Sequence, residues 1–307
     1  MFNYLIDKIK KAKFLTYPFK HIYIENFFSD NDFNKIINCS EIKIPKALTD
    51  ENLIDSLEAN GYKPIEFPGC ITYKNKYLKW HKTRKSTSQI NTSTEGFGMT
   101  LRLMSPKSEI LKKLNELLSS ENFNKTLADK FLVNFEETYI DNGIQKYLDG
   151  YEISPHPDTR HKKTTFMVNI NPHKNSKQMY HHTHYCTLKK EYNYLYDFWK
   201  NNLDINRCWV PWDWAETKFI QTENNSIVIF SPSDDTIHGV KTNYNHLNGQ
   251  RTQLYGNLWQ KNHKKIKMPM WSDLDLRQAP DRVDNSLRRK IKELIPVKYK
   301  EILKKYI

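Results

Sequence analysis

One stretch constrains the fold of this chain more than any other, and it reads Gln145-Lys146-Tyr147-Leu148-Asp149-Gly150-Tyr151-Glu152-Ile153-Ser154-Pro155-His156-Pro157-Asp158. His156 and Asp158 stand two residues apart, and in an extended segment two such side chains point to the same face. An imidazole and a carboxylate can therefore bind one metal ion, while Pro157 points away and offers no ligand. The pattern predicts a strand that leads into two metal ligands.

A third ligand is expected from a distant part of the chain. His238 follows the strand-like run Ser226-Ile227-Val228-Ile229-Phe230 and the turn Ser231-Pro232-Ser233. Two histidines and one carboxylate in the order His-x-Asp…His form a set that holds one face of an octahedral ferrous ion and leaves the opposite face open. Ligands from two distant strands would meet across a barrel.

An arginine follows the second histidine in Gly249-Gln250-Arg251-Thr252. We expect a strand–turn–strand hairpin to return the chain from His238 to the same pocket. The guanidinium group stays charged and binds a carboxylate through two hydrogen bonds, which suits the far carboxylate of 2-oxoglutarate. Inside a barrel such an arginine needs an anionic partner. The sequence therefore predicts an Fe(II) centre with an adjacent keto-acid site.

These segments resemble the prolyl-hydroxylase-like branch of the 2-oxoglutarate/Fe(II) oxygenases. The similarity covers residues 135–259 well and 19–28 weakly. It implies a double-stranded β-helix, or jelly roll, with ferrous iron at His156, Asp158 and His238. It also implies 2-oxoglutarate at Arg251, helped by the hydroxyl of Tyr147, with dioxygen as the other co-substrate.

The remaining pattern predicts a mainly β protein with supporting helices. A strand over 17–28 precedes a helix that Ser29 would cap, and amphipathic helices are expected over 108–119 and 122–132. The segment 43–91 is irregular. Further strands are expected over 97–104, 134–140, 144–147, 164–171, 226–230 and 251–259, with a turn at Asp141-Asn142-Gly143. We expect an oxygenase domain over 1–259, with its metal-binding core at about 134–259, and a helical extension over 260–307.

Composition excludes several classes of protein. No apolar run approaches the roughly 20 residues of a membrane span, and the N-terminus lacks the pattern of a signal peptide. We therefore expect a cytoplasmic protein without a membrane span. The four cysteines form no CxxC pair, which favours free thiols over a zinc ribbon or disulfides. Neither GxGxxG nor GxxxxGK[ST] occurs, which disfavours nucleotide-binding α/β folds.

Positive charge is concentrated at the C-terminal end. The chain has 48 basic and 35 acidic residues, a net charge of +13, and the segment 260–307 alone holds 14 basic and 6 acidic ones. Nucleic acid or an acidic partner could bind such a tail. A solvated lysine-rich helix is the favoured interpretation.

The leading hypothesis is a dioxygenase that hydroxylates an unactivated C–H bond of a small molecule and releases succinate and CO2. Desaturation or cyclisation would use the same residues. The resemblance also implies a difference from the related halogenases, which have a small residue at the position of Asp158. A first alternative is a hydroxylase of a nucleic-acid base or protein side chain, although demethylases of alkylated bases usually carry a second arginine where Asn257 stands. A second alternative is a non-catalytic jelly-roll binding module.

Two segments depart from the family pattern. Residues 174–186 read KNSKQMYHHTHYC where many relatives are glycine-rich and acidic, and 188–214 contains four tryptophans. Both departures argue against peptidyl-proline as the substrate. His181, His182 and His184 are expected to be exposed loop residues rather than a second metal site. The tryptophans suit either core packing or stacking on a substrate ring. Arg160 and Lys163 suit either an anionic substrate or a solvated loop.

Overall fold

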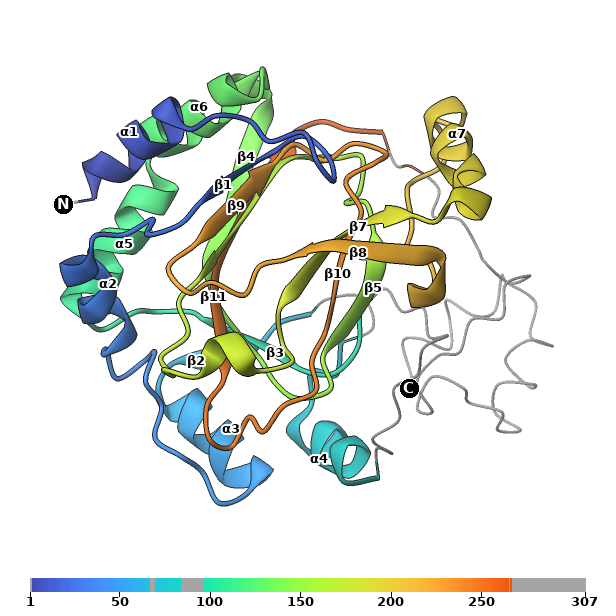
Figure 1. Cartoon of the computed structure of the whole chain (residues 1–307). Helices are drawn as coiled ribbons and strands as arrows, with labels where there is room; N and C mark the ends of the chain where they lie inside the picture. Colours follow the sequence, from blue (N-terminus) through green and yellow to red (C-terminus); the bar gives the residue numbers. More distant parts are fainter. Residues whose placement is uncertain (1, 67–69, 84–95, 265, 267–307) are drawn as a thin grey trace, which may run out of the picture.

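Two antiparallel β-sheets face each other in the computed structural model, which describes residues 2–66, 70–83, 96–264 and 266 (Figure 1). The larger sheet has seven strands in the order β1-β9-β6-β11-β4-β3-β2, and the smaller has four in the order β5-β10-β7-β8. The prediction of mainly antiparallel β structure with supporting helices is confirmed for this part of the chain.

Both sheets are built from strands far apart in sequence. The larger sheet contains β1 (His21–Ile24), β2 (Tyr62–Pro64), β3 (Thr100–Leu103), β4 (Thr138–Tyr147), β6 (Lys162–Asn169), β9 (Ile227–Phe230) and β11 (Arg251–Gln260). The smaller sheet contains β5 (Glu152–His156), β7 (Thr183–Leu188), β8 (Ala215–Ile220) and β10 (His238–Lys241).

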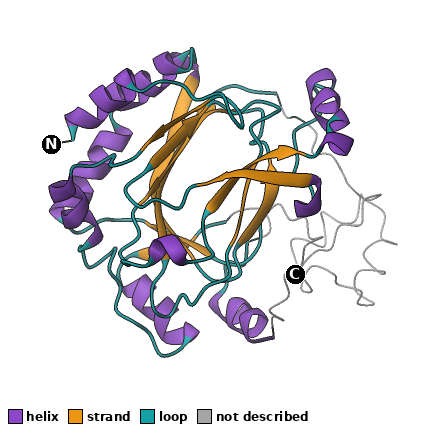
Figure 2. Ribbon diagram, viewed as in Figure 1, coloured by secondary structure: helices purple, strands orange, loops and turns teal. Residues whose placement is uncertain are grey.

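Four helices cover the outer face of the larger sheet (Figures 1 and 2). They are α1 (Asn3–Lys11), α2 (Asp30–Ile37), α5 (Glu109–Ser119) and α6 (Glu121–Lys130). Each has an apolar stripe at helical spacing; in α5 it consists of Leu111, Leu114, Leu117 and Leu118, all buried. The stripes and the outward side chains of the sheet form the main hydrophobic core.

The alternation of side chains along β11 separates this core from the pocket. Leu254 and Leu258 are fully buried in the core under the helices. Arg251, Gln253 and Tyr255 point to the opposite face and line the pocket. Because β11 pairs with β4 along its whole length, its first residue, Arg251, lies directly opposite Tyr147.

The remaining helices lie at the ends and the side of the two sheets. They are α3 (Asp50–Ala59), α4 (Lys74–Thr83) and α7 (Tyr194–Asn201), with short 3-10 turns at η1 (Phe135–Glu137), η2 (Ser176–Gln178), η3 (Lys190–Tyr192) and η4 (Trp212–Trp214). Leu195 and Trp199 of α7 pack with Cys186 and Leu188 of β7 in a second core. In the described part of the segment 43–91, which was expected to be irregular, the structure has the helices α3 and α4 and the strand β2.

Two predictions of local structure are wrong. The turn expected at Asp141-Asn142-Gly143 lies inside the continuous strand β4, because Asn142 pairs with Gly256 of β11 and sheet pairing outweighs turn propensity. The hairpin expected between His238 and Arg251 does not form either. β10 belongs to the smaller sheet and β11 to the larger one, so the connecting loop crosses from one sheet to the other.

Other predictions agree with the structure or fall outside the part it describes. Ser29 caps α2 through a hydrogen bond from the backbone N–H of Asp32, and no disulfide joins any of the four cysteines, all of which are described. The strand expected over 17–28 is limited to β1. Among the described helices, none has the length and apolar character to cross a membrane. Most of the C-terminal extension, from residue 267 on, lies outside the described residues.

Candidate metal centre

The two sheets bring His156, Asp158 and His238 together. His156 is the last residue of β5 and His238 the first of β10, and the two are paired in the smaller sheet. Gly239 permits this pairing, because a Cβ there would lie 2.9 Å from the backbone nitrogen of Pro155. Glycine at this position therefore lets β10 approach β5 closely.

Backbone carbonyls set the orientation of both imidazoles. The Nδ1 atom of His156 lies 2.8 Å from the carbonyl oxygen of Ser154, and the Nδ1 atom of His238 lies 2.9 Å from that of Thr236. A carbonyl only accepts hydrogen bonds, so each Nδ1 carries the proton and each Nε2 keeps its lone pair. A metal-binding histidine needs this tautomer.

The two Nε2 atoms face the carboxylate of Asp158. Each lies 3.9 Å from one of its oxygens, and the three potential ligand atoms all lie within 4.8 Å of one another. Asp158 is 3% exposed. Its oxygens accept hydrogen bonds from Thr165 Oγ1 at 2.7 Å and from Lys162 Nζ at 2.6 Å. The residues fit a divalent ion that prefers two imidazoles and one carboxylate.

The protonation states also suit a metal centre. Burial lowers the pKa of His156 to about 3, and His238 adds to the effect. Burial likewise lowers the pKa of His238. Burial alone would raise the pKa of Asp158, but Lys162 and the two histidines outweigh it and hold that pKa below its usual range. Two neutral imidazoles and one carboxylate result at neutral pH.

Arg251 lies in the same pocket and has one nitrogen without a partner. Its Nη2 donates to Thr183 Oγ1 at 2.8 Å and to Gln253 Oε1 at 2.9 Å. Its Nη1 is buried and has no hydrogen-bond partner among the described residues. Burial lowers the pKa of Arg251. A buried guanidinium group with an orphaned N–H fits a carboxylate ligand.

Tyr147 contacts Arg251 through its ring. The guanidinium carbon lies 4.3 Å from the ring centroid, which is cation–π geometry. The Tyr147 hydroxyl donates to Gln145 Oε1 at 2.5 Å, and burial raises the pKa of Tyr147 to about 12. In this arrangement Tyr147 positions Arg251, and its hydroxyl is engaged by Gln145.

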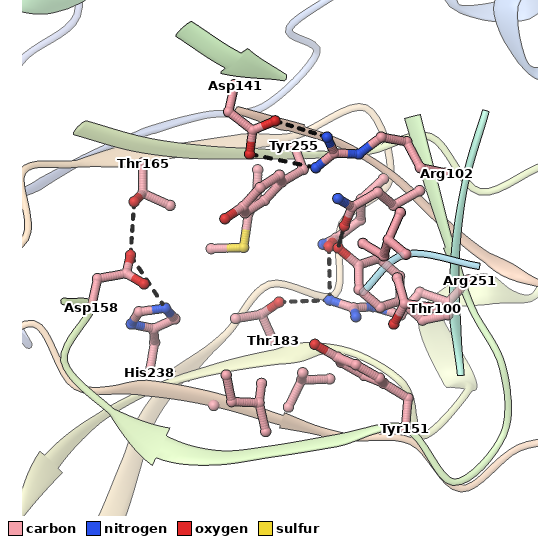
Figure 3. A pocket seen from close by; sticks show the side chains of 18 of the residues that line it. Thr100, Arg102, Asp141, Tyr151, Asp158, Thr165, Thr183, His238, Arg251 and Tyr255 are labelled. Atoms are coloured by element: carbon pink, nitrogen blue, oxygen red, sulfur yellow. Dashed lines mark hydrogen bonds and ion pairs between the residues drawn. The ribbon is translucent and has the colours of Figure 1, made fainter. Parts of the chain in front are cut away.

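A cavity of about 640 Å³ connects these groups. Figure 3 shows Asp158 and His238 on one side of it, and Arg251 with Thr183 on another. Both sheets line the cavity, and at its rim lie the exposed side chains of Lys63 and Glu66. The volume is in the range of pockets that bind small molecules.

Several residues of this pocket have no sequence signal. Thr183 lies in the histidine-rich stretch 174–186, and Lys162 is one of two adjacent lysines after the metal motif. Nothing local marks Arg102 and Asp141, which form an ion pair in the pocket with a distance of 2.8 Å. Their proximity depends on the pairing of β3 with β4.

Outside the pocket, the structure decides between the alternative roles of the histidine pair His181 and His182, of Trp199 and of Arg160. His181 and His182 are buried, 2% and 6% exposed, so their prediction as exposed loop residues is wrong. They lie in the segment that enters β7, and their rings stand 4.5 Å apart. Trp199 is fully buried against β7, which favours core packing. Arg160 donates to the carbonyl of Ile205 and pairs with Asp234, so it is a structural residue.

Comparisons with known proteins give structural matches only. No protein-family model matches the chain, and no curated protein matches it. A prolyl-4-hydroxylase from Pseudomonas putida has a TM-score of 0.41 and 8% identity, covering 85% of this chain and 100% of that one. A prolyl hydroxylase from Trichoplax adhaerens, in complex with a hypoxia inducible factor peptide, has a TM-score of 0.42 and 12% identity, covering 84% and 88%.

A third similar structure is a 2OG-Fe(II) oxygenase family oxidoreductase from Burkholderia pseudomallei. Its TM-score is 0.31 and its identity 10%, and the match covers 72% of this chain and 98% of that one. Because these scores and identities are low, the case for a function depends on the geometry of the site itself.

Proposed function

We propose that the chain is a 2-oxoglutarate- and Fe(II)-dependent dioxygenase that hydroxylates a small molecule. In this proposal the two facing sheets are a double-stranded β-helix, and His156, Asp158 and His238 hold the iron. The observation that carries the proposal is the tautomer of the two histidines. Carbonyl acceptors at both Nδ1 atoms leave two Nε2 lone pairs aimed at one buried carboxylate.

The unpaired Nη1 of Arg251 supports the assignment of 2-oxoglutarate as the co-substrate. Arg251 and Thr183 would hold the far carboxylate of 2-oxoglutarate, while Tyr147 and Gln253 keep the guanidinium group in place. The dianion would also offset the cost of the buried positive charge. When bound, Fe(II) supplies the redox chemistry that couples decarboxylation of the keto acid to oxidation of a C–H bond.

The chain's own residues prepare the site for this chemistry. Thr165 and Lys162 fix the Asp158 carboxylate through hydrogen bonds to its two oxygens. Asp158 and His238 are buried, which limits the access of bulk water to this side of the site. The cavity of about 640 Å³ suits a small molecule beside 2-oxoglutarate. Hydroxylation of a macromolecule through the basic tail stays a prediction, because most of that tail lies outside the described residues.

Anaerobic titration tests this proposal. We expect 2-oxoglutarate added to Fe(II)-loaded protein to produce a visible metal-to-ligand charge-transfer band. His156→Ala should abolish the band. Arg251→Met should weaken co-substrate affinity about tenfold to a hundredfold, since it removes charge-assisted hydrogen bonds. Arg251→Lys should lie between Arg251→Met and the unsubstituted protein, because an ammonium group keeps the charge without the planar geometry.

His184→Ala is the matched control. His184 lies on β7 next to Thr183, but its Nδ1 contacts Thr217 Oγ1 and it does not line the cavity. Its substitution should leave the band unchanged. A folded, iron-loaded protein that gives no band would refute the dioxygenase proposal and favour the binding-module alternative.

A further inference from the structure

The side chain of Arg102 lines the cavity and passes over Gly143. It lies on β3 opposite Gln145 of β4, and its side chain extends along the inner face of the sheet over Gly143. A Cβ at position 143 would lie 3.1 Å from Arg102 Cδ and 3.2 Å from Cγ. Any larger residue at 143 would therefore displace the arginine.

Asp141 holds the far end of this arginine. Arg102 Nη1 donates to Asp141 Oδ1 at 2.8 Å, and Nη2 lies 3.5 Å from Oδ2. The side chains remain 22% and 32% exposed, and both line the cavity (Figure 3). The guanidinium group is thus fixed in direction, and part of it stays accessible from the space that a substrate would occupy.

The charges of the cavity leave one positive charge uncompensated. The proposed function is the premise for this count. Within the cavity Arg102 is paired with Asp141 and Lys162 with Asp158, while the rim residues Lys63 and Glu66 cancel. Bound Fe(II) and the 2-oxoglutarate dianion also cancel. With Arg251 included, the formal charges of the whole cavity then sum to plus one, a net charge that an anionic substrate would neutralise.

We propose that the substrate carries a carboxylate that binds to Arg102. Guanidinium groups prefer carboxylates and bind them in a fixed orientation. Asp141 is the positioning residue, because it holds the guanidinium group in place in the cavity lining, while Arg102 Nε has no hydrogen-bond partner among the described residues. A carboxylate held at Arg102, in the same cavity as the triad, would orient the rest of the molecule relative to the proposed metal centre.

A purely structural ion pair is the competing explanation. A partly exposed pair between neighbouring strands contributes about 0–1 kcal/mol to stability. Such a pair would need neither the glycine beneath the arginine nor a place inside the cavity. The two explanations differ in what they predict for binding of small acids.

Binding of matched acids and amides separates them. The probes are hexanoic acid with hexanamide and phenylacetic acid with phenylacetamide, titrated calorimetrically into protein loaded with Mn(II) and 2-oxoglutarate, so that the co-substrate already occupies Arg251. Each acid should bind at least about tenfold more tightly than its amide, since one charge-assisted hydrogen bond is lost in the amide. Hexylamine, as a cationic probe, should not bind.

Substitutions at Arg102 and Gly143 should reduce or remove the preference for acids over amides. Arg102→Met should abolish the difference between acid and amide. Gly143→Ala keeps every charge but crowds the arginine, so it should reduce the difference while the protein stays folded. Lys112→Met removes a positive charge from the exposed face of α5 and should change nothing.

The proposal is overturned by equal binding of acids and amides, by a preference that survives Arg102→Met, by preferential binding of hexylamine, or by the absence of acid binding at millimolar concentration. The charge-transfer band is recorded separately on the same proteins. A band without an acid preference would refute only the carboxylate proposal. An acid preference without a band would refute the dioxygenase proposal and leave an anion-binding pocket.

Discussion

Two clusters in this molecule each combine two histidines with one aspartate. His156, Asp158 and His238 lie in the pocket, and Asp50, His81 and His246 lie where α3 and α4 meet the loops of the sheets. In both clusters the potential ligand atoms lie within 4.8 Å of one another. Their residue types and spacing are alike, but the protons on their imidazole rings are placed differently.

In the second cluster the protons are in the wrong place for a metal. The backbone N–H of Asp149 donates to His246 Nδ1 at 2.9 Å, so the proton of this ring sits on Nε2, which lies 2.8 Å from Asp50. His81 lies between two carboxylates, with Nδ1 2.6 Å from Asp50 and Nε2 2.9 Å from Asp149. Neither ring directs a free lone pair at the aspartate. The partner of the second ring nitrogen therefore distinguishes a cluster whose ring nitrogens are all engaged in hydrogen bonds from one that could hold a metal ion.

Removing one histidine from each cluster should give the largest contrast. We expect His156→Ala to lower the affinity for Fe(II) more than about a hundredfold, beyond the range typical of changes outside the ligand set. His246→Ala should leave that affinity within about twofold. Competition with a chromophoric chelator under anaerobic conditions measures both. An equal loss in the two variants would contradict the assignment of protons in the second cluster.

The second cluster should make the free energy of unfolding depend on pH through the charge of His81. Burial would lower the pKa of His81, but Asp149 and Asp50 outweigh it and raise that pKa from 6.5 to about 9. The charged ring thus stabilises the folded state fully below pH 6.5, and this contribution is lost as the pH rises through 9. After allowance for its partial exposure, the loss is on the order of 2 kcal/mol.

Comparing the unsubstituted protein with His81→Gln isolates the effect of His81 from that of other groups. One such group is Lys146: burial lowers its pKa to about 7, so its contribution to stability rises with pH where that of His81 falls. His81→Gln keeps hydrogen-bonding groups without the charge. The gap in free energy of unfolding between the unsubstituted protein and the variant should shrink from pH 6 to about pH 9. A gap independent of pH would mean that folding does not raise the pKa of His81.

Local signals explain which parts of this fold could be predicted. The strand that ends in His156, the helix capped by Ser29 and the leucine stripe of α5 each follow from patterns within a few residues. Helix α3 also has such a signal, since Thr49 accepts a hydrogen bond from the N–H of Asn52, but the nearby prolines obscure it. The sequence order of triad and arginine predicted that these groups share a pocket.

What could not be predicted depends on pairing between distant strands. Arg102 meets Asp141 only because β3 lies beside β4 and Gly143 leaves room between them. The Asp-Asn-Gly sequence predicts a turn, and only its pairing with β11 makes it a strand. The tautomers of the triad likewise depend on carbonyls whose direction is set by the sheet. These features require the assembled structure.

The smallest expected effect concerns the hydroxyl of Thr165, which holds the carboxylate of the proposed metal centre. Thr165 Oγ1 donates to Asp158 at 2.7 Å. Thr165→Val keeps the shape of the side chain but removes this hydrogen bond, so Asp158 would lose one of the two contacts that fix it. Loss of such a contact lowers metal affinity about tenfold in comparable sites. The chelator competition described above measures the change.

Thr164→Val is the matched control for this substitution. Thr164 is the neighbouring residue on β6, fully buried on the opposite face, and its hydroxyl has no hydrogen-bond partner among the described residues. Removing an unpaired hydroxyl should leave metal affinity unchanged and should not lower stability. Equal effects of the two variants would mean that β6 tolerates valine poorly at either position. A tenfold loss confined to Thr165→Val would instead mean that metal binding depends on the orientation of the Asp158 carboxylate as well as on its presence.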